Sequence, residues 1–272
     1  MRRRLIVNAD DFGRSPSINA AIVRAHRDGI LTSASLMVNE PAFEEAVALA
    51  RQNPKLGVGL HLTLLCGHAA LGRDKIPGLI NERGEFSDQP VGVGMKYFFK
   101  RELREQLREE IRAQFEKFRA TGLTLDHVNG HLHLHLHPVI FRLLMDDCER
   151  FGIRRMRLTR EPFWMDFPLA RGRRWYRASH AMVYSWLSRR AEPDFRARDL
   201  RHVGRTFGLL EDSHVDEAYV LKLLAILPAG DSELYSHPSL DNFKHEFEAL
   251  ISPRVRERIE QLGIERIRYQ DL

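Results

Sequence analysis

The sequence predicts an α/β fold whose strands and helices close into a distorted, TIM-like (β/α) barrel. Short β-like runs alternate with helical patterns along most of the chain, as parallel strands joined by crossover helices require. Seven strand candidates are close to the eight strands of a complete barrel. The length of 272 residues also suits one barrel.

The strand candidates are short apolar runs bounded by turn residues. They lie at residues 5–8, 33–38, 57–62, 125–129, 153–158, 233–236 and 266–269. The clearest helix is expected at 98–119, where Phe99, Phe118 and four residues between them form one apolar stripe before Gly122. Further helices are expected at 17–28, 42–52, 138–150, 215–227 and 244–262.

Two segments fit the alternation poorly: residues 67–96, rich in Gly and Pro, and residues 160–205, rich in Arg and aromatic residues. We expect both to be insertions over the C-terminal face of the strands, where barrel enzymes place their chemistry. Residues 1–272 are therefore expected to form a single domain that contains these insertions.

The composition excludes several classes of protein. The hydrophobic fraction of 43% and charged fraction of 29% are those of a globular chain. No apolar run of about 20 residues and no signal-peptide pattern is present, so a cytoplasmic location is expected. Cys66 and Cys148 have no Cys-x-x-Cys partner. Nucleotide-binding glycine loops and the Gly-x-Ser-x-Gly motif are also absent, which disfavours nucleotide binding and serine catalysis.

Residues 171–205 contain ten arginines, no lysine and three acidic residues, with aromatic residues between them. This mixture suits peripheral contact with an anionic surface such as the inner membrane face, or nucleic acid. A solvated basic helix that packs its aromatic side on the domain explains it equally well. Because no nucleic-acid recognition motif accompanies the charge, we expect no nucleic-acid partner. The sequence leaves a homodimer open.

The first strand candidate leads into Asn-Ala-Asp-Asp-Phe-Gly, which places Asp10 and Asp11 side by side before a glycine turn. At a strand end, one carboxylate can bind a cation and the other can accept a proton from water. Taken alone, the pair is more often a turn or helix-cap feature.

Three further signals place histidines at strand ends. His61 and His237 each close an apolar strand, and either could simply be a hydrogen-bonded core residue. Residues 127–137 contain five histidines, and an extended conformation would place all of them on one face. Imidazoles gathered in this way favour a metal site. Because catalytic zinc uses about three protein ligands, most of the five must have other roles.

Parallel strands in a barrel bring all four of these strand ends around one cleft. Together they offer what metal-assisted amide hydrolysis needs: ligands for a Lewis-acid cation, a carboxylate base and a proton donor for the leaving amine.

These motifs, together with Thr-Ser-Ala-Ser at 32–35 and Glu-Leu-x-x-His-Pro at 233–238, resemble the YdjC-like carbohydrate deacetylase family, which includes chitooligosaccharide deacetylase. The resemblance implies a distorted barrel, one divalent metal ion such as zinc or magnesium, and hydrolysis of the acetamide of an N-acetylglucosamine-containing substrate. It also implies metal ligands at Asp11, His61 and His131, a base at Asp10 and an acid at His237.

One position departs from the family pattern. Where the family has His-x-Asp-Ser-His, this chain has Asn129 and Gly130 before His131. The lost carboxylate could weaken support for a ligand histidine. With Arg-Glu-Pro at 160–162 and the Arg/aromatic segment, the histidine block resembles the hopanoid-biosynthesis-associated branch, which implies a lipid-linked sugar as substrate.

Three rival functions stay open from the sequence. The substrate could be a soluble chitooligosaccharide. A histidine-rich metallophosphoesterase would also cluster histidines at a barrel rim, although the usual His-x-His near the first strand is absent. A metal-storage or metal-sensing protein would use the histidines of 127–137 but would not need Asp10.

Overall fold

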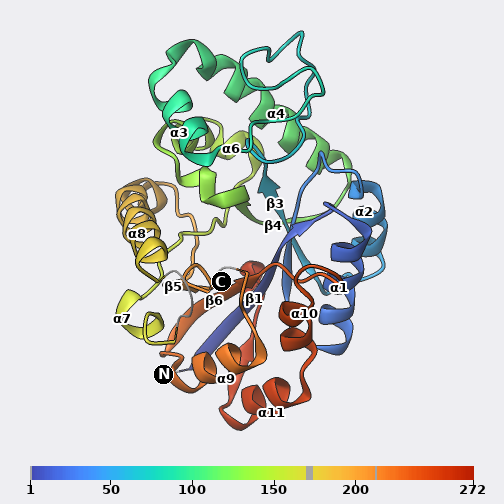
Figure 1. The fold of residues 1–272 in the computed structure, drawn as a ribbon, viewed down its shortest axis with the longest axis vertical. Coiled ribbons are helices and arrows are strands. Elements are labelled where there is room, and N and C mark those ends of the chain that lie inside the picture. The colour runs from blue at the N-terminus through green and yellow to red at the C-terminus, as the bar shows by residue number, and fades with distance from the viewer. Residues whose placement is uncertain (1, 170–173, 212) are drawn as a thin grey trace.

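The computed structural model describes residues 2–169, 174–211 and 213–272. A curled, all-parallel sheet runs through the middle of the molecule and forms a half-barrel (Figure 1). The strands follow the order β4-β3-β2-β1-β6-β5, and β7 also pairs with β1. This confirms the predicted α/β class, and the curled sheet is consistent with a distorted barrel. The strands are β1 (Arg3–Phe12), β2 (Ser33–Leu36), β3 (Gly57–Leu62), β4 (Leu125–Gly130), β5 (Arg205–Phe207), β6 (Gly230–Ser236) and β7 (Ile264–Arg266).

Helices surround the sheet, and the core lies between the two layers. The α-helices are α1 (Pro16–Asp28), α2 (Phe43–Arg51), α3 (Pro90–Phe99), α4 (Arg104–Ala120), α5 (Pro138–Asp146), α6 (Cys148–Phe151), α7 (Phe163–Asp166), α8 (Arg174–Ala197), α9 (Glu217–Ile226), α10 (Lys244–Ile251) and α11 (Pro253–Gln261). Three 3-10 helices are η1 (Arg101–Leu103), η2 (His131–Leu136) and η3 (Tyr269–Asp271). Among the described residues, no helix is both long and apolar enough to cross a membrane.

The strand prediction was wrong in two regions. One is residues 266–269, where β7 has already ended at Arg266 and η3 begins at Tyr269. Residues 153–158 form no strand, because they meet the sheet only at isolated bridges, Val128 to Met156 and Arg155 to Arg201. They still run alongside β4, since the Val128 amide donates to the Arg155 carbonyl at 3.0 Å. The strand that pairs with β6 on the side away from β1 is β5, which begins at the last residue of the 160–205 segment and was not predicted.

Three predicted helices are divided. The 138–150 helix breaks at Asp147 into α5 and α6. The 244–262 helix breaks at Ser252, because Pro253 lacks an amide donor, and the Ser252 side chain then caps α11. The 98–119 helix breaks at Lys100, whose backbone is extended between α3 and η1. Phe99 therefore ends α3 and is 66% exposed instead of joining the buried stripe of α4.

The segment that precedes α3 is tied to the helical layer by buried carboxylates. Glu110 of α4 accepts hydrogen bonds from the amides of Ala70 and Leu71 at 2.8 and 3.0 Å. Glu40 accepts one from the His68 amide at 2.8 Å. Backbone donors that would otherwise lie unpaired are thereby satisfied, and the segment has a defined path.

Candidate active site at the carboxyl ends of the strands

The end of β1 turns two adjacent carboxylates toward one imidazole. Neighbouring side chains of a regular strand point to opposite faces. Here the β1–β2 register shifts between Ala9 and Phe12, and Asp11 adopts a left-handed φ of 66°. Asp10 Oδ1 lies 3.9 Å from His61 Nδ1, and Asp11 Oδ1 lies 3.4 Å from His61 Nε2. The strained turn, which costs on the order of 1 kcal/mol, therefore builds the site.

The turn that follows requires glycine, and another residue caps the next helix. Gly13 has a φ of 95°, and a Cβ there would lie 2.8 Å from the carbonyl oxygen of Met37. Helix α1 is capped by Ser15, whose side chain accepts a hydrogen bond from the first turn. Asp10 and Asp11 are thus not the helix-capping residues that a turn motif alone would suggest.

Asp11, His61 and His131 form a group that could hold a metal ion. Their ligand atoms all lie within 4.8 Å of one another. His131 Nδ1 is 3.0 Å from Asp11 Oδ1 and 3.3 Å from His61 Nε2. Ligands of a tetrahedral zinc ion, each about 2.1 Å from the metal, lie roughly 3.4 Å apart, which is close to these separations.

The hydrogen bonds around this group also fit a cation. The Asn129 amide nitrogen faces Asp10, so its oxygen faces His61 Nδ1 at 2.7 Å and accepts a hydrogen bond from it. His61 Nε2 is then unprotonated, and its lone pair points into the group. Asp11 Oδ1 is buried and has no hydrogen-bond partner in the described part of the chain. Two imidazoles and one carboxylate suit zinc better than magnesium, which prefers oxygen ligands.

Asp10 is held by a buried arginine. Arg157 donates to Asp10 Oδ2 at 2.7 Å and to Oδ1 at 3.1 Å, and its side chain is fully buried. Asn8 and Asn129 also donate to Asp10 Oδ1, at 2.8 and 3.0 Å. Burial acts to raise the pKa of Asp10, but the charge and hydrogen bonds of Arg157 outweigh it and hold this pKa far below its ordinary value. Asp10 is therefore ionised and held in one orientation.

The same arginine binds a second carboxylate. Arg157 lies 2.6 Å from Glu233 of β6, and the Tyr269 hydroxyl donates to Glu233 at 2.5 Å. One guanidinium thus lies between two buried carboxylates, which compensates the cost of burying each charge. Our sequence analysis missed Arg157 and Glu233. An acidic residue in an otherwise buried strand was the available signal for Glu233.

The five clustered histidines do not form an extended row. Strand β4 ends at Gly130, and residues 131–136 form η2, in which Leu132 and His133 have left-handed φ values of 48° and 57°. The sharp turn separates the imidazoles, and only His131 reaches Asp11 and His61. The alternation of His and Leu in this block reflects a turn and not a strand.

The other histidines of the block have partners in the protein. His133 contacts the Tyr235 hydroxyl at 3.1 Å, and His135 Nε2 contacts the Arg157 carbonyl at 3.0 Å. Burial lowers the pKa of His135 to about 3, so this imidazole is neutral near pH 7. The two remaining rings contact groups outside the block: His127 contacts Asp126 and Ser35, and His137 contacts the Gly94 carbonyl.

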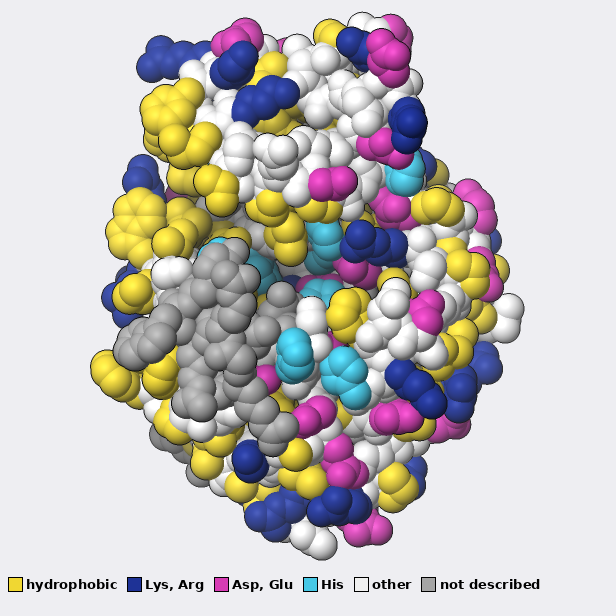
Figure 2. Space-filling view, in the orientation of Figure 1, with side chains coloured by type: hydrophobic (Ala, Val, Ile, Leu, Met, Phe, Trp, Pro, Cys, Tyr) yellow, Lys and Arg dark blue, Asp and Glu magenta, His cyan; other side chains and the backbone are white. Residues whose placement is uncertain are grey.

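A cavity of about 510 Å³ opens at the strand ends. Asp10, His61 and His237 line it together. The structure thus places His237 in the same cavity as Asp10. The ring of His237 stands edge-on to Tyr235 at 5.9 Å, and its amide donates to Glu246 at 2.5 Å. Figure 2 shows histidine side chains gathered around a hollow at the centre of this face.

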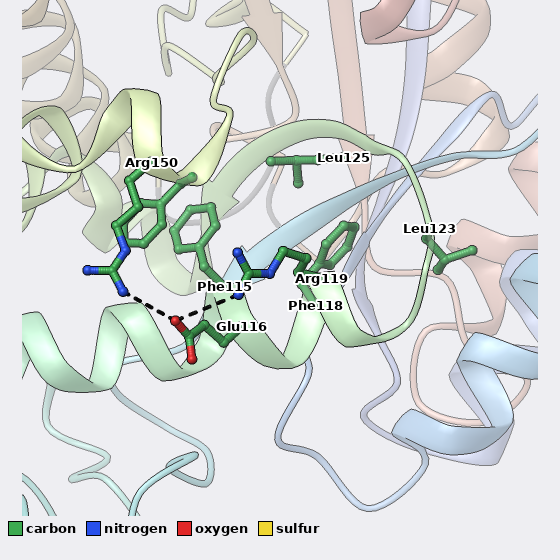
Figure 3. A pocket seen from close by; sticks show the side chains of 8 residues that line it. Phe115, Glu116, Phe118, Arg119, Leu123, Leu125 and Arg150 are labelled. Atoms are coloured by element: carbon green, nitrogen blue, oxygen red, sulfur yellow. Dashed lines mark hydrogen bonds and ion pairs between the residues drawn. The ribbon is translucent and has the colours of Figure 1, made fainter.

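A second hollow lies away from these residues, between the C-terminal half of α4, the start of β4 and α6 (Figure 3). It measures about 110 Å³ and is mainly apolar, with Phe115 and Phe118 in its wall. Its carboxylate, Glu116, is paired with Arg150 at 3.3 Å and with Arg119 at 3.9 Å. Because Glu116 is neutralised by these two arginines, this hollow offers no available acid, base or metal ligand. The strand-end cavity is therefore the candidate active site.

A family model described as YdjC-like protein matches residues 4–261. The chain belongs to the YdjC-like family. The carbohydrate deacetylase of Brevibacillus brevis is 43% identical over 153 residues, 55% of this chain and 57% of that protein. The carbohydrate deacetylase of Geobacillus stearothermophilus is 41% identical over 154 residues, 56% of this chain and 59% of that protein. The match therefore spans less than two thirds of the length of either relative.

A solved structure shares the complete fold. It is a protein of Enterococcus faecalis V583 with a provisional description as a cellobiose-phosphate cleavage protein. The superposition has a TM-score of 0.75 at 25% sequence identity and covers 100% of this chain and 99% of that one. The curled sheet and its surrounding helices are thus an architecture that occurs in another protein across its whole length.

Proposed function

We propose that the protein is a metal-dependent N-deacetylase that hydrolyses the acetamide of an N-acetylglucosamine-containing substrate. The observation that carries this proposal is the placement of an ionised carboxylate, Asp10, directly beside the Asp11, His61 and His131 group. The YdjC-like family membership and the similarity to two carbohydrate deacetylases support an acetylated sugar as substrate.

Each residue of the site has a role in this reaction. Asp11, His61 and His131 would hold the cation, which would supply Lewis acidity toward the acetamide carbonyl. Asp10 accepts a proton from the attacking water, and Arg157 keeps Asp10 ionised and oriented. Water adds to the carbonyl carbon and the C–N bond breaks. His237 donates the proton that the departing amine needs, so the products are acetate and a free amino sugar.

We infer that all 272 residues form one domain and that the two irregular segments shape the substrate cavity. Pro90 and Val91 belong to the 67–96 segment and line the cavity on one side. His180 and Tyr184, from the 160–205 segment, line it on another. These contributions support the expectation that both segments are insertions over the strand ends.

We also infer that the acetylated sugar is attached to a lipid, as in the hopanoid-associated branch. Val91, Leu132 and Leu209 give the cavity apolar walls, which suit a sugar with an apolar stem better than a chain of free sugars. The alternative substrate is a soluble chitooligosaccharide. The Arg/aromatic segment supports contact with a membrane surface, although residues 171–173 and the side chains of 174–177 lie outside the described residues.

The decisive experiment incubates the purified protein with acetylglucosaminyl lipids, chitooligosaccharides and a phosphate monoester. Mass spectrometry is expected to show loss of one acetyl mass and equimolar acetate from an acetylated sugar. Phosphate release without acetate would instead identify a metallophosphoesterase. A protein that binds metal but converts none of these substrates would be a metal-binding protein without this activity.

A further inference from the structure

The exposed hydrophobic side chains are gathered on one part of the surface. Ten large hydrophobic side chains are exposed among the described ones, and nine belong to α3, α7, α8 and η2; the tenth is Ile226 of α9. Those of α3, η2 and α8 are Val91, Met95, Phe98, Phe99, Leu132, Met182, Val183 and Trp186, which together we name the apolar rim. Figure 2 shows hydrophobic side chains gathered beside the hollow, over α3 and α8.

The apolar rim is continuous with the candidate active site. Val91 and Leu132 belong to the rim and also line the catalytic cavity. A neighbouring hollow of about 280 Å³ lies between η2 and α8, where His137 and Val183 line it together. The His137 ring is 6.2 Å from the ring of Phe98, so it connects the α3 half of the rim with the α8 half.

Packing within the chain does not account for this exposure. Phe99 is 66% exposed, Met182 65% and Trp186 56%, although burying such side chains would each stabilise the protein by about 1.5–3 kcal/mol. A contiguous exposed apolar surface of this kind marks a site that binds a membrane or another protein.

The charges beside the rim select the partner. Lys96, Lys100 and Arg101 lie on or just after α3, and residues 90–101 contain no acidic residue. On α8, Arg189 and Arg190 are exposed, and Arg190 lies 5.7 Å from the ring of Trp186. A second copy of this chain would bring one basic rim against another, which is repulsive. Aromatic residues with Lys and Arg around them are typical of contact with anionic headgroups.

We propose that the apolar rim docks the protein on an anionic lipid bilayer, with the mouth of the catalytic cavity facing the headgroups. The inference rests on the proposed function, because a lipid-linked sugar would then enter the cavity without leaving the bilayer. The proposed membrane-binding surface includes α3 as well as the Arg/aromatic segment. With both included, the mouth of the catalytic cavity faces the bilayer.

The test is cosedimentation with vesicles of phosphatidylcholine alone and of phosphatidylcholine mixed with phosphatidylglycerol. The protein is expected to bind the mixed vesicles about tenfold more tightly, and high salt is expected to weaken that binding. The double variants Met95→Ser/Phe99→Ser and Met182→Ser/Trp186→Ser should each lower binding about tenfold or more. Matched substitutions on α9, Ile226→Ser and Lys222→Glu, should leave binding unchanged.

Acetate release from a soluble acetylated chitooligosaccharide separates this inference from the proposed function. The rim variants do not alter cavity-lining residues, so their activity on this soluble substrate should equal that of the parent protein, which also verifies folding. A protein that releases acetate but does not bind mixed vesicles overturns the docking inference alone. Vesicle binding without hydrolysis of any acetylated sugar overturns the proposed function alone. A dimer in sedimentation velocity that the rim substitutions dissociate would also overturn the docking inference.

Discussion

Histidines 131 and 135 lie four residues apart in the same block, yet their surroundings are opposite. His131 lies with His61 and Asp11, whose buried Oδ1 lacks a hydrogen-bond partner among the described residues. His135 is fully buried and is bound through Nε2 to the Arg157 carbonyl. A cluster of histidines in a sequence therefore does not identify the ligand. The candidate ligand is the histidine whose nitrogen faces other potential ligand atoms, and the other histidines contact protein groups around it.

The largest effect that the comparison predicts is on metal content. Asp11→Asn, His61→Ala and His131→Ala each remove a ligand atom, so bound metal should fall from about one ion per chain to near zero, and acetate release should reach background. His135→Asn is the matched control and should retain the metal. Atomic emission spectrometry of the purified proteins measures this, and a metal-loaded His131→Ala variant would contradict the assignment.

The next largest effect separates the two adjacent carboxylates. Asp10→Asn keeps the size of the side chain and leaves Asp11, His61 and His131 in place, so metal stoichiometry should be unchanged. Loss of the proton acceptor should lower kcat by about 10²–10⁴-fold. Metal content and initial rates of acetate release on the same preparation test this. Unchanged activity of Asp10→Asn would rule out Asp10 as the base.

A smaller effect is expected at Asn129, whose amide joins the ligand group to the base. Asn129→Ala removes the acceptor of the His61 proton and should weaken metal affinity about 10–100-fold. Asn129→Asp keeps that acceptor but places a carboxylate beside Asp10, so metal affinity should be retained while kcat falls. Competition with a chromophoric chelator and steady-state kinetics separate the two effects. Equal losses in both variants would show that Asn129 only fills space.

The smallest effect concerns stability and pH. The pKa of His135 is about 3 in the folded protein and near 6.5 in an unfolded chain, so the unfolded state binds the extra proton below pH 6.5. Stability from neutral His135 is therefore present above pH 6.5 and is lost as the pH falls toward 3, by up to about 1.4 kcal/mol per pH unit. Urea unfolding of metal-free protein should show a shallower pH dependence for His135→Asn than for the parent chain. Parallel curves would contradict this account.

The sequence predicted the parts of the site that lie at strand ends. Asp10, Asp11, His61 and His237 each follow or close an apolar run, and parallel strands bring such positions together. The α/β class with a parallel sheet was predictable for a related reason, because alternation of strands and helices is a local pattern.

Other parts depended on contacts between distant segments. Arg157 is one of three arginines at 154–157. Only the folded chain shows that Arg157 is the fully buried one and that it lies between Asp10 and Glu233. The left-handed turn at Asp11 was not predictable, since aspartate gives no strong signal for positive φ. The histidine block was misread as extended because alternation of His and Leu has the period of a strand.

Anomalous X-ray diffraction from crystals of the zinc-loaded protein tests the central claim most directly. The account predicts one strong anomalous peak between Asp11 Oδ1, His61 Nε2 and His131 Nδ1, and its absence in crystals of Asp11→Asn. A peak among His133, His135 and His137, or the same peak retained in the Asp11→Asn variant, would contradict it.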